Sequence, residues 1–490
     1  MEGEQPANDW SQYYNHQYHD YSRFHGCMAM LPLFSSCHNM PRRDGSLTLI
    51  NEINQAIRFL ISSSFATLIS SSKSTQRKIF FAGYDAFDTI WKDILSRCSV
   101  WTAWGAKMYC QQPENTLNSL RHGINFFDGI EFDIRMTADN QLVVHHDREV
   151  SIAQSHLQGR SKWVEGWTLA DLEAEGFISF RGMLEDSVIR ENWVEKGKMG
   201  CIEIKRPHPN APMGGGLFSR KKHDQHVANI IMMADKILDE FNVPHKNMIY
   251  YAFHKGMKKS SQLAKTQRPW AALIPYIPPY GNKTTQRIQT LPTYLSTPFS
   301  SLIKQHNAMG GAMLPCAIEY FVAPHNKLPF GKTVGLKGDN FLALNKLRKG
   351  MATYVWPTKP VNEKLIINAG LTGLSDKADP DLTWLPTGHA RWVNPGTQPL
   401  DMQQQLLLDS ATEENHLEIL KQLKLEVPTW ANCGDARRKD LVSMWKETWN
   451  WQKTVDELLQ DASGSSPPWQ APRLIGHRGS GKTSRPVIGQ

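Results

Sequence analysis

The sequence lacks paired cysteines and any recognisable secretion signal. Its seven cysteines are spread along the chain, and none forms a CxxC pair. This excludes a disulfide framework and a cysteine zinc site, and it indicates reduced thiols in a cytoplasmic protein. The N-terminus has no charged segment followed by an apolar run, so no signal peptide is expected.

Long apolar runs are also missing, and basic residues cluster only at 219–223 and 437–439. The most apolar stretch, residues 56–69, is short and interrupted by serines, so we expect no stable membrane insertion. The net charge of +8, from 55 Lys and Arg against 47 Asp and Glu, favours anionic ligands such as phosphates. The basic residues are scattered and are not interleaved with aromatic residues, so no nucleic-acid partner is expected.

Short β runs alternate with helical patterns through the middle of the chain of 490 residues. This alternation predicts an α/β fold with a parallel sheet, and the number of units favours a closed (β/α)8 TIM barrel. The predicted parts are a tail and helical extension (1–100), the main part of the barrel (101–384), a helical insertion and linker (385–468) and a C-terminal strand and loop (469–490). The strands are predicted at 129–134, 142–145, 200–204, 248–252, 271–274, 312–315 and 352–356, and the main helices at 116–125, 169–174, 225–241 and 338–348.

Acidic and histidine residues gather at the ends of the predicted strands. Glu131 and Asp133 alternate on one strand and therefore point to the same side. Glu203 and Lys205 repeat this spacing on a later strand, and His146 ends the strand between them. Carboxylates suit a hard divalent cation, Ca²⁺ or Mg²⁺, a lysine can hold an anion, and a histidine can act as acid or base.

Each of these features alone has an ordinary structural explanation. An isolated pair of acids on a strand is usually solvated or ion-paired, and a His-Asp at a strand end is often a turn. Their occurrence in order on successive predicted strands, where barrel enzymes carry their catalytic groups, favours an active site.

The motifs in this region resemble those of the glycerophosphodiester phosphodiesterases, which are phospholipase C-like phosphodiesterase barrels. The resemblance covers about residues 110–380 and is strongest up to Lys205. It rests on Pro113-Glu114-Asn115-Thr116, Glu131-Phe132-Asp133, His146-Asp147 and Glu203-Ile204-Lys205, with weaker similarity at Ile249–Phe253, Tyr354–Trp356 and Gly370–Asp376.

One family motif is displaced. The family has His-Arg-Gly upstream of the Pro-Glu-Asn-Thr motif, whereas here His477-Arg478-Gly479 follows a short apolar strand near the other end of the chain. This order predicts a circularly permuted barrel whose C-terminal strand fills the first position, beside the eighth strand. An artefact of gene assembly would give the same order.

The resemblance implies metal-dependent hydrolysis of a glycerophosphodiester to sn-glycerol 3-phosphate and an alcohol. It assigns the metal to Glu131, Asp133 and Glu203. It makes His477 and His146 the base and the acid. The substrate phosphate is assigned to Arg478 and Lys205, and Trp356 is a candidate wall of the glycerol pocket.

Three alternatives remain open. The same residues would serve a lysophospholipase D or sphingomyelinase D-like enzyme acting on lysolipids. An inactive barrel could act as a binding module if the C-terminal strand does not dock. Residues 476–483 also match the phosphate-binding GxxxxGK[ST] pattern, but that reading requires a following helix and a downstream acidic strand.

Overall fold

The computed structural model describes residues 111–483 except 151, 153–156, 158, 214–219, 275–296, 322–333, 380–381, 386 and 463. The predicted N-terminal tail and helical extension therefore lie outside the described residues. Within the described ranges, no helix has the length and apolar character needed to cross a membrane.

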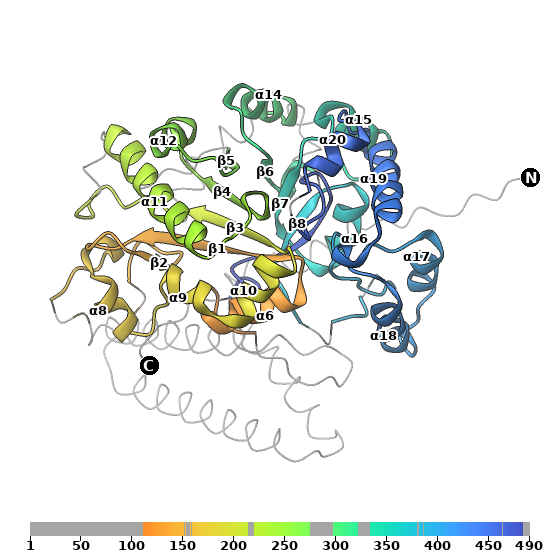
Figure 1. Ribbon diagram of the computed structural model, residues 1–490, viewed down its shortest axis with the longest axis horizontal. Helices are drawn as coiled ribbons and strands as arrows, with labels where there is room; N and C mark the ends of the chain where they lie inside the picture. Colours follow the sequence, from red (N-terminus) through yellow and green to blue (C-terminus); the bar gives the residue numbers. More distant parts are fainter. Residues whose placement is uncertain are drawn as a thin grey trace, which may run out of the picture. The chain divides into compact units, whose positions relative to one another are not determined.

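Eight parallel strands form the centre of the molecule (Figure 1). Their order around the sheet is β5-β4-β3-β1-β9-β8-β7-β6. The two ends of this series meet where the Ala312 amide donates a hydrogen bond of 2.8 Å to the Trp270 carbonyl, just before β6. The predicted TIM barrel is confirmed. The strands are β1 (Gly129–Met136), β3 (Met199–Ile204), β4 (Met248–Ala252), β5 (Trp270–Ala272), β6 (Leu314–Ala317), β7 (Thr353–Thr358), β8 (Thr372–Ser375) and β9 (Leu474–Gly476).

One predicted strand does not belong to the barrel. β2 (Leu142–Val144) pairs antiparallel with β1, with Ile134 opposite Val144. Only about five residues separate the two strands, which is a hairpin connection and is too short for the crossover that a parallel strand requires. The expectation that His146 follows a strand of the barrel series is therefore wrong, because the histidine follows a hairpin strand.

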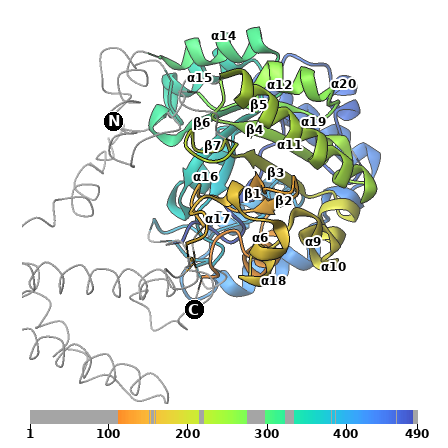
Figure 2. The same cartoon turned by 90° about the vertical axis from the view of Figure 1, so that its left-hand side faces the viewer.

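Helices lie around the outside of the strands, as the perpendicular view shows (Figure 2). Their apolar faces pack on the outward side chains of the sheet, so both faces of the strands are buried. The helices are α6 (Leu117–Phe126), α8 (Leu169–Ala174), α9 (Phe180–Glu185), α10 (Ser187–Arg190), α11 (Arg220–Glu240), α12 (Met257–Ala264), α14 (Phe299–Met309), α15 (Gly338–Arg348), α16 (Pro360–Asn368), α17 (Met402–Asp409), α18 (His416–Glu426), α19 (Asp435–Trp449) and α20 (Val455–Gln460).

The segment between β8 and β9 is helical and packs against the barrel. Trp430, Trp445, Trp449 and Trp451 form a buried aromatic cluster at its centre. The indole of Trp449 donates a hydrogen bond of 3.1 Å to the carbonyl of Asn368 at the end of α16. These contacts fix α19 on the outside of the barrel and bring the chain back to the sheet.

β9 fills the gap between β1 and β8. Ile130 pairs with Gly476 on one side, and Gly373 pairs with Leu474 on the other. The buried carboxylate of Asp128, which precedes β1, accepts hydrogen bonds from the amides of Leu474 and Thr397. The last strand is therefore an integral part of the closed barrel, and the loop after it opens on the same end as the loops after β1 and β3.

Candidate active site

Three carboxylates meet at the carboxyl ends of β1 and β3. Asp133 pairs in register with Glu203, and Glu131 lies two residues earlier on β1. One oxygen of each side chain lies within 4.8 Å of the others, and all three residues are buried. Such a compact set of oxygen ligands fits a divalent cation such as Ca²⁺ or Mg²⁺.

The electrostatics of this cluster reflect its crowding. Burial and the neighbouring Asp133 raise the pKa of Glu131 to about 7. Burial also raises the pKa of Glu203. Burial acts in the same sense on Asp133, but the charges of Lys205 and Arg478 outweigh it and lower its pKa to about 2. A bound divalent cation would offset the repulsion among the three carboxylates.

Lys205 lies against the carboxylates. Its Nζ is 2.9 Å from Asp133 Oδ1, and it also forms an ion pair with Glu203 Oε1. Its side chain is only 12% exposed, so these pairs are protected from water. Lys205 therefore lies at the edge of the acidic cluster.

The loop after β9 brings the C-terminal motif to the first strand. The amide of Arg478 donates a hydrogen bond of 2.8 Å to Glu131 Oε2, and the amide of Gly479 donates one of 3.0 Å to the Glu131 carbonyl. His477 Nε2 lies 3.8 Å from Glu131 Oε2. His477 and Arg478, predicted from the far end of the sequence, thus stand beside the three carboxylates.

The backbone of this loop requires its glycine. Arg478 and Gly479 have φ values of +56° and +94°. A Cβ on Gly479 would come within 2.5 Å of the Ser119 hydroxyl oxygen, and that hydroxyl accepts a hydrogen bond from the Ser480 amide. Glycine tolerates both this backbone conformation and the close approach of Ser119, which allows the loop to lie directly on α6.

The Pro-Glu-Asn-Thr segment joins this loop to the three carboxylates. Asn115 Nδ2 donates a hydrogen bond of 2.8 Å to Asp133 Oδ2. Arg478 Nη1 donates one of 2.6 Å to Glu114 Oε1, and both of these residues are buried. Thr116 caps α6 by accepting a hydrogen bond from the Ser119 amide, which fixes the direction of the segment. The motif was visible in the sequence, but these individual roles were not.

His477 has an acidic partner on the neighbouring strand end. Its Nδ1 lies 2.7 Å from Oδ1 of Asp376, which directly follows β8. Burial acts to lower the pKa of His477, but the hydrogen bond to Asp376 and the charge of Glu131 outweigh it and raise the pKa. The sequence included Asp376 in the weak family similarity at Gly370–Asp376 but assigned it no role. That similarity is the signal that could have revealed it.

His146 lies on the hairpin side of the site. Its Nδ1 is 2.9 Å from Asp147 Oδ1, and its side chain is 22% exposed. The hydrogen bond between Arg135 Nη2 and the His146 carbonyl, 3.1 Å long, ties the backbone here to β1. His146 therefore has the two features of an acid–base group, a carboxylate that orients the ring and access to solvent.

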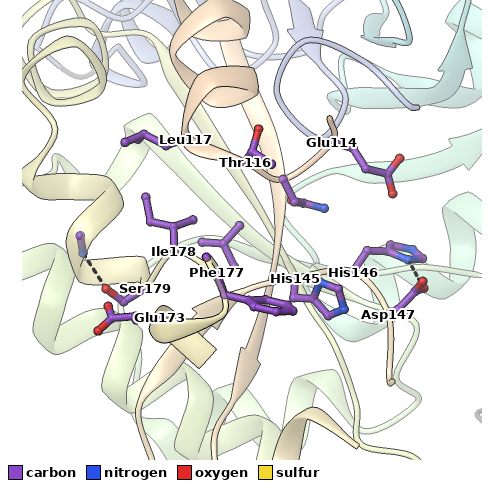
Figure 3. A pocket seen from close by; sticks show the side chains of 14 residues that line it. Glu114, Thr116, Leu117, His145, His146, Asp147, Glu173, Phe177, Ile178 and Ser179 are labelled. Carbon is purple, nitrogen blue, oxygen red and sulfur yellow. Dashed lines mark hydrogen bonds and ion pairs between the residues drawn. The ribbon is translucent and has the colours of Figure 1, made fainter. Parts of the chain in front are cut away.

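A cavity of about 390 Å³ begins at His146. Glu114, His146 and Asp147 line one part of it, and Glu173 and Ser179 lie on the opposite side (Figure 3). Apolar side chains, among them Leu117, Val144, Phe177 and Ile178, line the space between. The cavity thus extends from His146 along the Pro-Glu-Asn-Thr segment.

Trp356 lies elsewhere on the rim of the barrel. It is near the end of β7, is half-buried, and its ring makes an edge contact with Phe253 at a centroid distance of 6.1 Å. It does not line the cavity beside His146. Its role as a pocket wall stays a prediction.

The C-terminal loop does not have the geometry of a nucleotide phosphate cradle. Such a cradle needs backbone amides that point freely at the phosphates. Here the amides of His477, Arg478, Gly479 and Ser480 are bonded to Ser375, Glu131 and Ser119. The match to GxxxxGK[ST] therefore has another cause, the packing of this loop against the barrel.

Residues 105–298 match the model of the "Glycerophosphoryl diester phosphodiesterase family". No protein among those with curated descriptions matches the chain. Solved structures that resemble it include a glycerophosphodiester phosphodiesterase from Thermotoga maritima, with 17% identity over 50% of this chain and 79% of that chain and a TM-score of 0.28. A second is an Oleispira antarctica phosphodiesterase in complex with the product sn-glycerol-3-phosphate (15% identity, 54% and 88% coverage, TM-score 0.32).

A third is a glycerophosphodiester phosphodiesterase from Parabacteroides distasonis (15% identity, 55% and 86% coverage, TM-score 0.33). The matched residues contain β1, β3 and β4, and with them the three carboxylates, Lys205 and His146. Over residues 105–298, the chain is therefore similar to the glycerophosphoryl diester phosphodiesterase family.

Proposed function

We propose that this protein hydrolyses glycerophosphodiesters to sn-glycerol 3-phosphate and an alcohol. One observation carries the proposal: His477 and Arg478 lie beside Glu131, within the same group of side chains as the other two carboxylates. The match of residues 105–298 to the phosphodiesterase family model supports it, because these residues contain the three carboxylates, Lys205 and His146.

Glu131, Asp133 and Glu203 would hold a divalent cation, Ca²⁺ or Mg²⁺. When bound, the cation supplies Lewis acidity, which polarises the phosphate and lowers the pKa of a coordinated hydroxyl group. The fit rests on three oxygen ligands from adjacent strands, and on burial and the neighbouring Asp133, which together raise the pKa of Glu131.

His477 is proposed as the base that removes the proton from the glycerol hydroxyl group. The hydroxyl oxygen then attacks phosphorus, and a cyclic phosphate forms as the bond to the alcohol breaks. Asp376, bonded to Nδ1 of His477, orients the ring and stabilises its protonated form. His146 gives a proton to the departing alcohol, and water opens the ring with the two roles reversed.

Arg478 and Lys205 are proposed to stabilise the charge that develops on the phosphoryl oxygens. Both are nearly buried, at 8% and 12% side-chain exposure, which strengthens their interaction with an anion. Glu114 holds the Arg478 guanidinium in place through Nη1. Because Nε is buried 3.7 Å from Asp133 Oδ2, Nη2 is the candidate for contact with the phosphate.

The strand order supports a circularly permuted barrel as the origin of this arrangement. β9 lies between β8 and β1, although it is the last strand in the chain. The loop after it reaches the Pro-Glu-Asn-Thr segment, because the Glu114 amide donates a hydrogen bond of 2.9 Å to Thr483 Oγ1. A direct connection from this loop into Pro113 would restore the family order of motifs.

The proposal is tested by release of glycerol 3-phosphate from glycerophosphocholine. We expect activity with added Mg²⁺ or Ca²⁺, loss of activity with EDTA, and loss of about two orders of magnitude or more in His146→Ala and His477→Ala, the range typical of acid–base groups. Folding of each variant is checked by circular dichroism. Activity that survives both chelation and His146→Ala contradicts the mechanism, whereas a folded wild-type protein without activity favours a binding module.

A further inference from the structure

The cavity beside His146 has a distinct charge. Its acidic lining residues are Glu114, Asp147 and Glu173, and none of the described lining residues is a lysine or an arginine. Glu114 is already paired with Arg478, and Asp147 with His146. Glu173 is exposed at the opposite side of the cavity, so its charge is available to a ligand.

His145 and Phe177 form an aromatic part of the cavity wall. His145 makes an edge contact with Phe177 at 5.0 Å between centroids. An aromatic wall with a carboxylate at its edge is a favourable environment for an alkylammonium group.

The position of the cavity determines which part of a substrate can enter it. On the proposed function, His146 protonates the alcohol that leaves, so the alcohol must lie beside this ring. The three metal-binding carboxylates do not line the cavity, whereas His146 does. The glycerol phosphate therefore stays at the barrel mouth, and the leaving alcohol extends toward Phe177 and Glu173. A volume of about 390 Å³ suits a small polar alcohol.

We propose that this cavity is the leaving-group subsite and that it selects glycerophosphodiesters whose alcohol carries a positive charge, such as an amino alcohol or its quaternary ammonium form. Glu173 is the specificity-determining residue. This inference rests on the proposed function, because it needs His146 as the group that meets the leaving alcohol.

The test compares kcat/KM for glycerophosphoethanolamine with kcat/KM for glycerophosphoglycerol, whose alcohol is neutral. We expect a preference for the cationic substrate that falls about two- to fivefold in Glu173→Gln, the effect of one partly exposed ion pair. Glu173→Lys should lower it further. Glu185→Gln, an exposed acid on α9 that does not line the cavity, is the matched control and should leave the ratio unchanged.

The outcomes separate this inference from the proposed function. Hydrolysis of both substrates with a ratio that is the same in wild type, Glu173→Gln and Glu173→Lys overturns the charge selection and leaves the phosphodiesterase activity intact. Hydrolysis of neither substrate contradicts the proposed function itself. Raising the salt concentration should reduce the wild-type preference, because the pair is partly exposed. A wild-type substrate preference that does not change with salt concentration would also contradict the role of Glu173 in charge selection.

Discussion

The hydrogen bond between Asp376 and His477 offers a sharp test of the proposed mechanism. The two atoms, Asp376 Oδ1 and His477 Nδ1, are 2.7 Å apart, and the histidine side chain is only 10% exposed. Asp376→Asn keeps the size of the side chain but removes its charge. His477 then loses the group that orients the ring and stabilises its protonated form.

The size of the effect follows from the strength of this bond. A hydrogen bond to a charged group contributes about 1.5–3 kcal/mol. Because about 1.4 kcal/mol corresponds to a factor of ten in rate, we expect kcat to fall about 10- to 150-fold if the bond is fully expressed in the transition state. The measurement is steady-state release of glycerol 3-phosphate at saturating metal.

Two controls isolate the role of Asp376. Asp186→Asn removes a buried carboxylate that caps α10 and pairs with Arg121, so it should reduce stability without a comparable loss of kcat. The double variant Asp376→Asn/His477→Ala should be no slower than His477→Ala alone, because Asp376 acts through the histidine. An Asp376→Asn protein that keeps more than half of wild-type kcat would refute this reasoning.

Three further outcomes are expected. Mg²⁺ or Ca²⁺ should raise the melting temperature of the wild-type protein, because a bound cation relieves the repulsion among the carboxylates. The melting temperature of the double variant Glu131→Gln/Glu203→Gln should not change. Equal shifts of the two proteins in calorimetry would place the ion at another site. The pKa of His145 is lowered from 6.5 to about 4, so the unfolded chain binds the extra proton below pH 6.5 and stability falls as the pH falls. The free energy of unfolding of the wild-type protein should therefore fall by about 2 kcal/mol between pH 7 and pH 5. In urea unfolding, His145→Gln should lose correspondingly less stability over the same pH range. An identical loss of stability in the two proteins would contradict this expectation. Glu363→Gln breaks the buried ion pair with Arg391 and should lower the free energy of unfolding in urea by about 3–5 kcal/mol. Glu149→Gln breaks an exposed pair with Lys162 and should lower it by at most about 1 kcal/mol. Equal losses of stability in the two variants would show that burial is not the cause of the difference.

The local patterns in the sequence were sufficient for most of the barrel. Apolar runs predicted β4 at Met248–Ala252 with the bounds that the structure has, and the helices at Leu169–Ala174 and Gly338–Arg348 likewise. The reason is that burial on both faces of a parallel strand and helical periodicity both leave a direct record in the chain. β2 was misassigned because an apolar run looks the same in a hairpin and in a barrel strand.

The sequence by itself therefore determined the fold class and predicted that Glu131 and Asp133 share a face, since residue type and spacing along a strand set which groups point to the same side. Only the tertiary structure decided that β9 returns between β8 and β1, that Asp376 meets His477, and that Glu114 meets Arg478. These contacts join residues hundreds of positions apart. They depend on closure of the barrel, which no local pattern in the chain records.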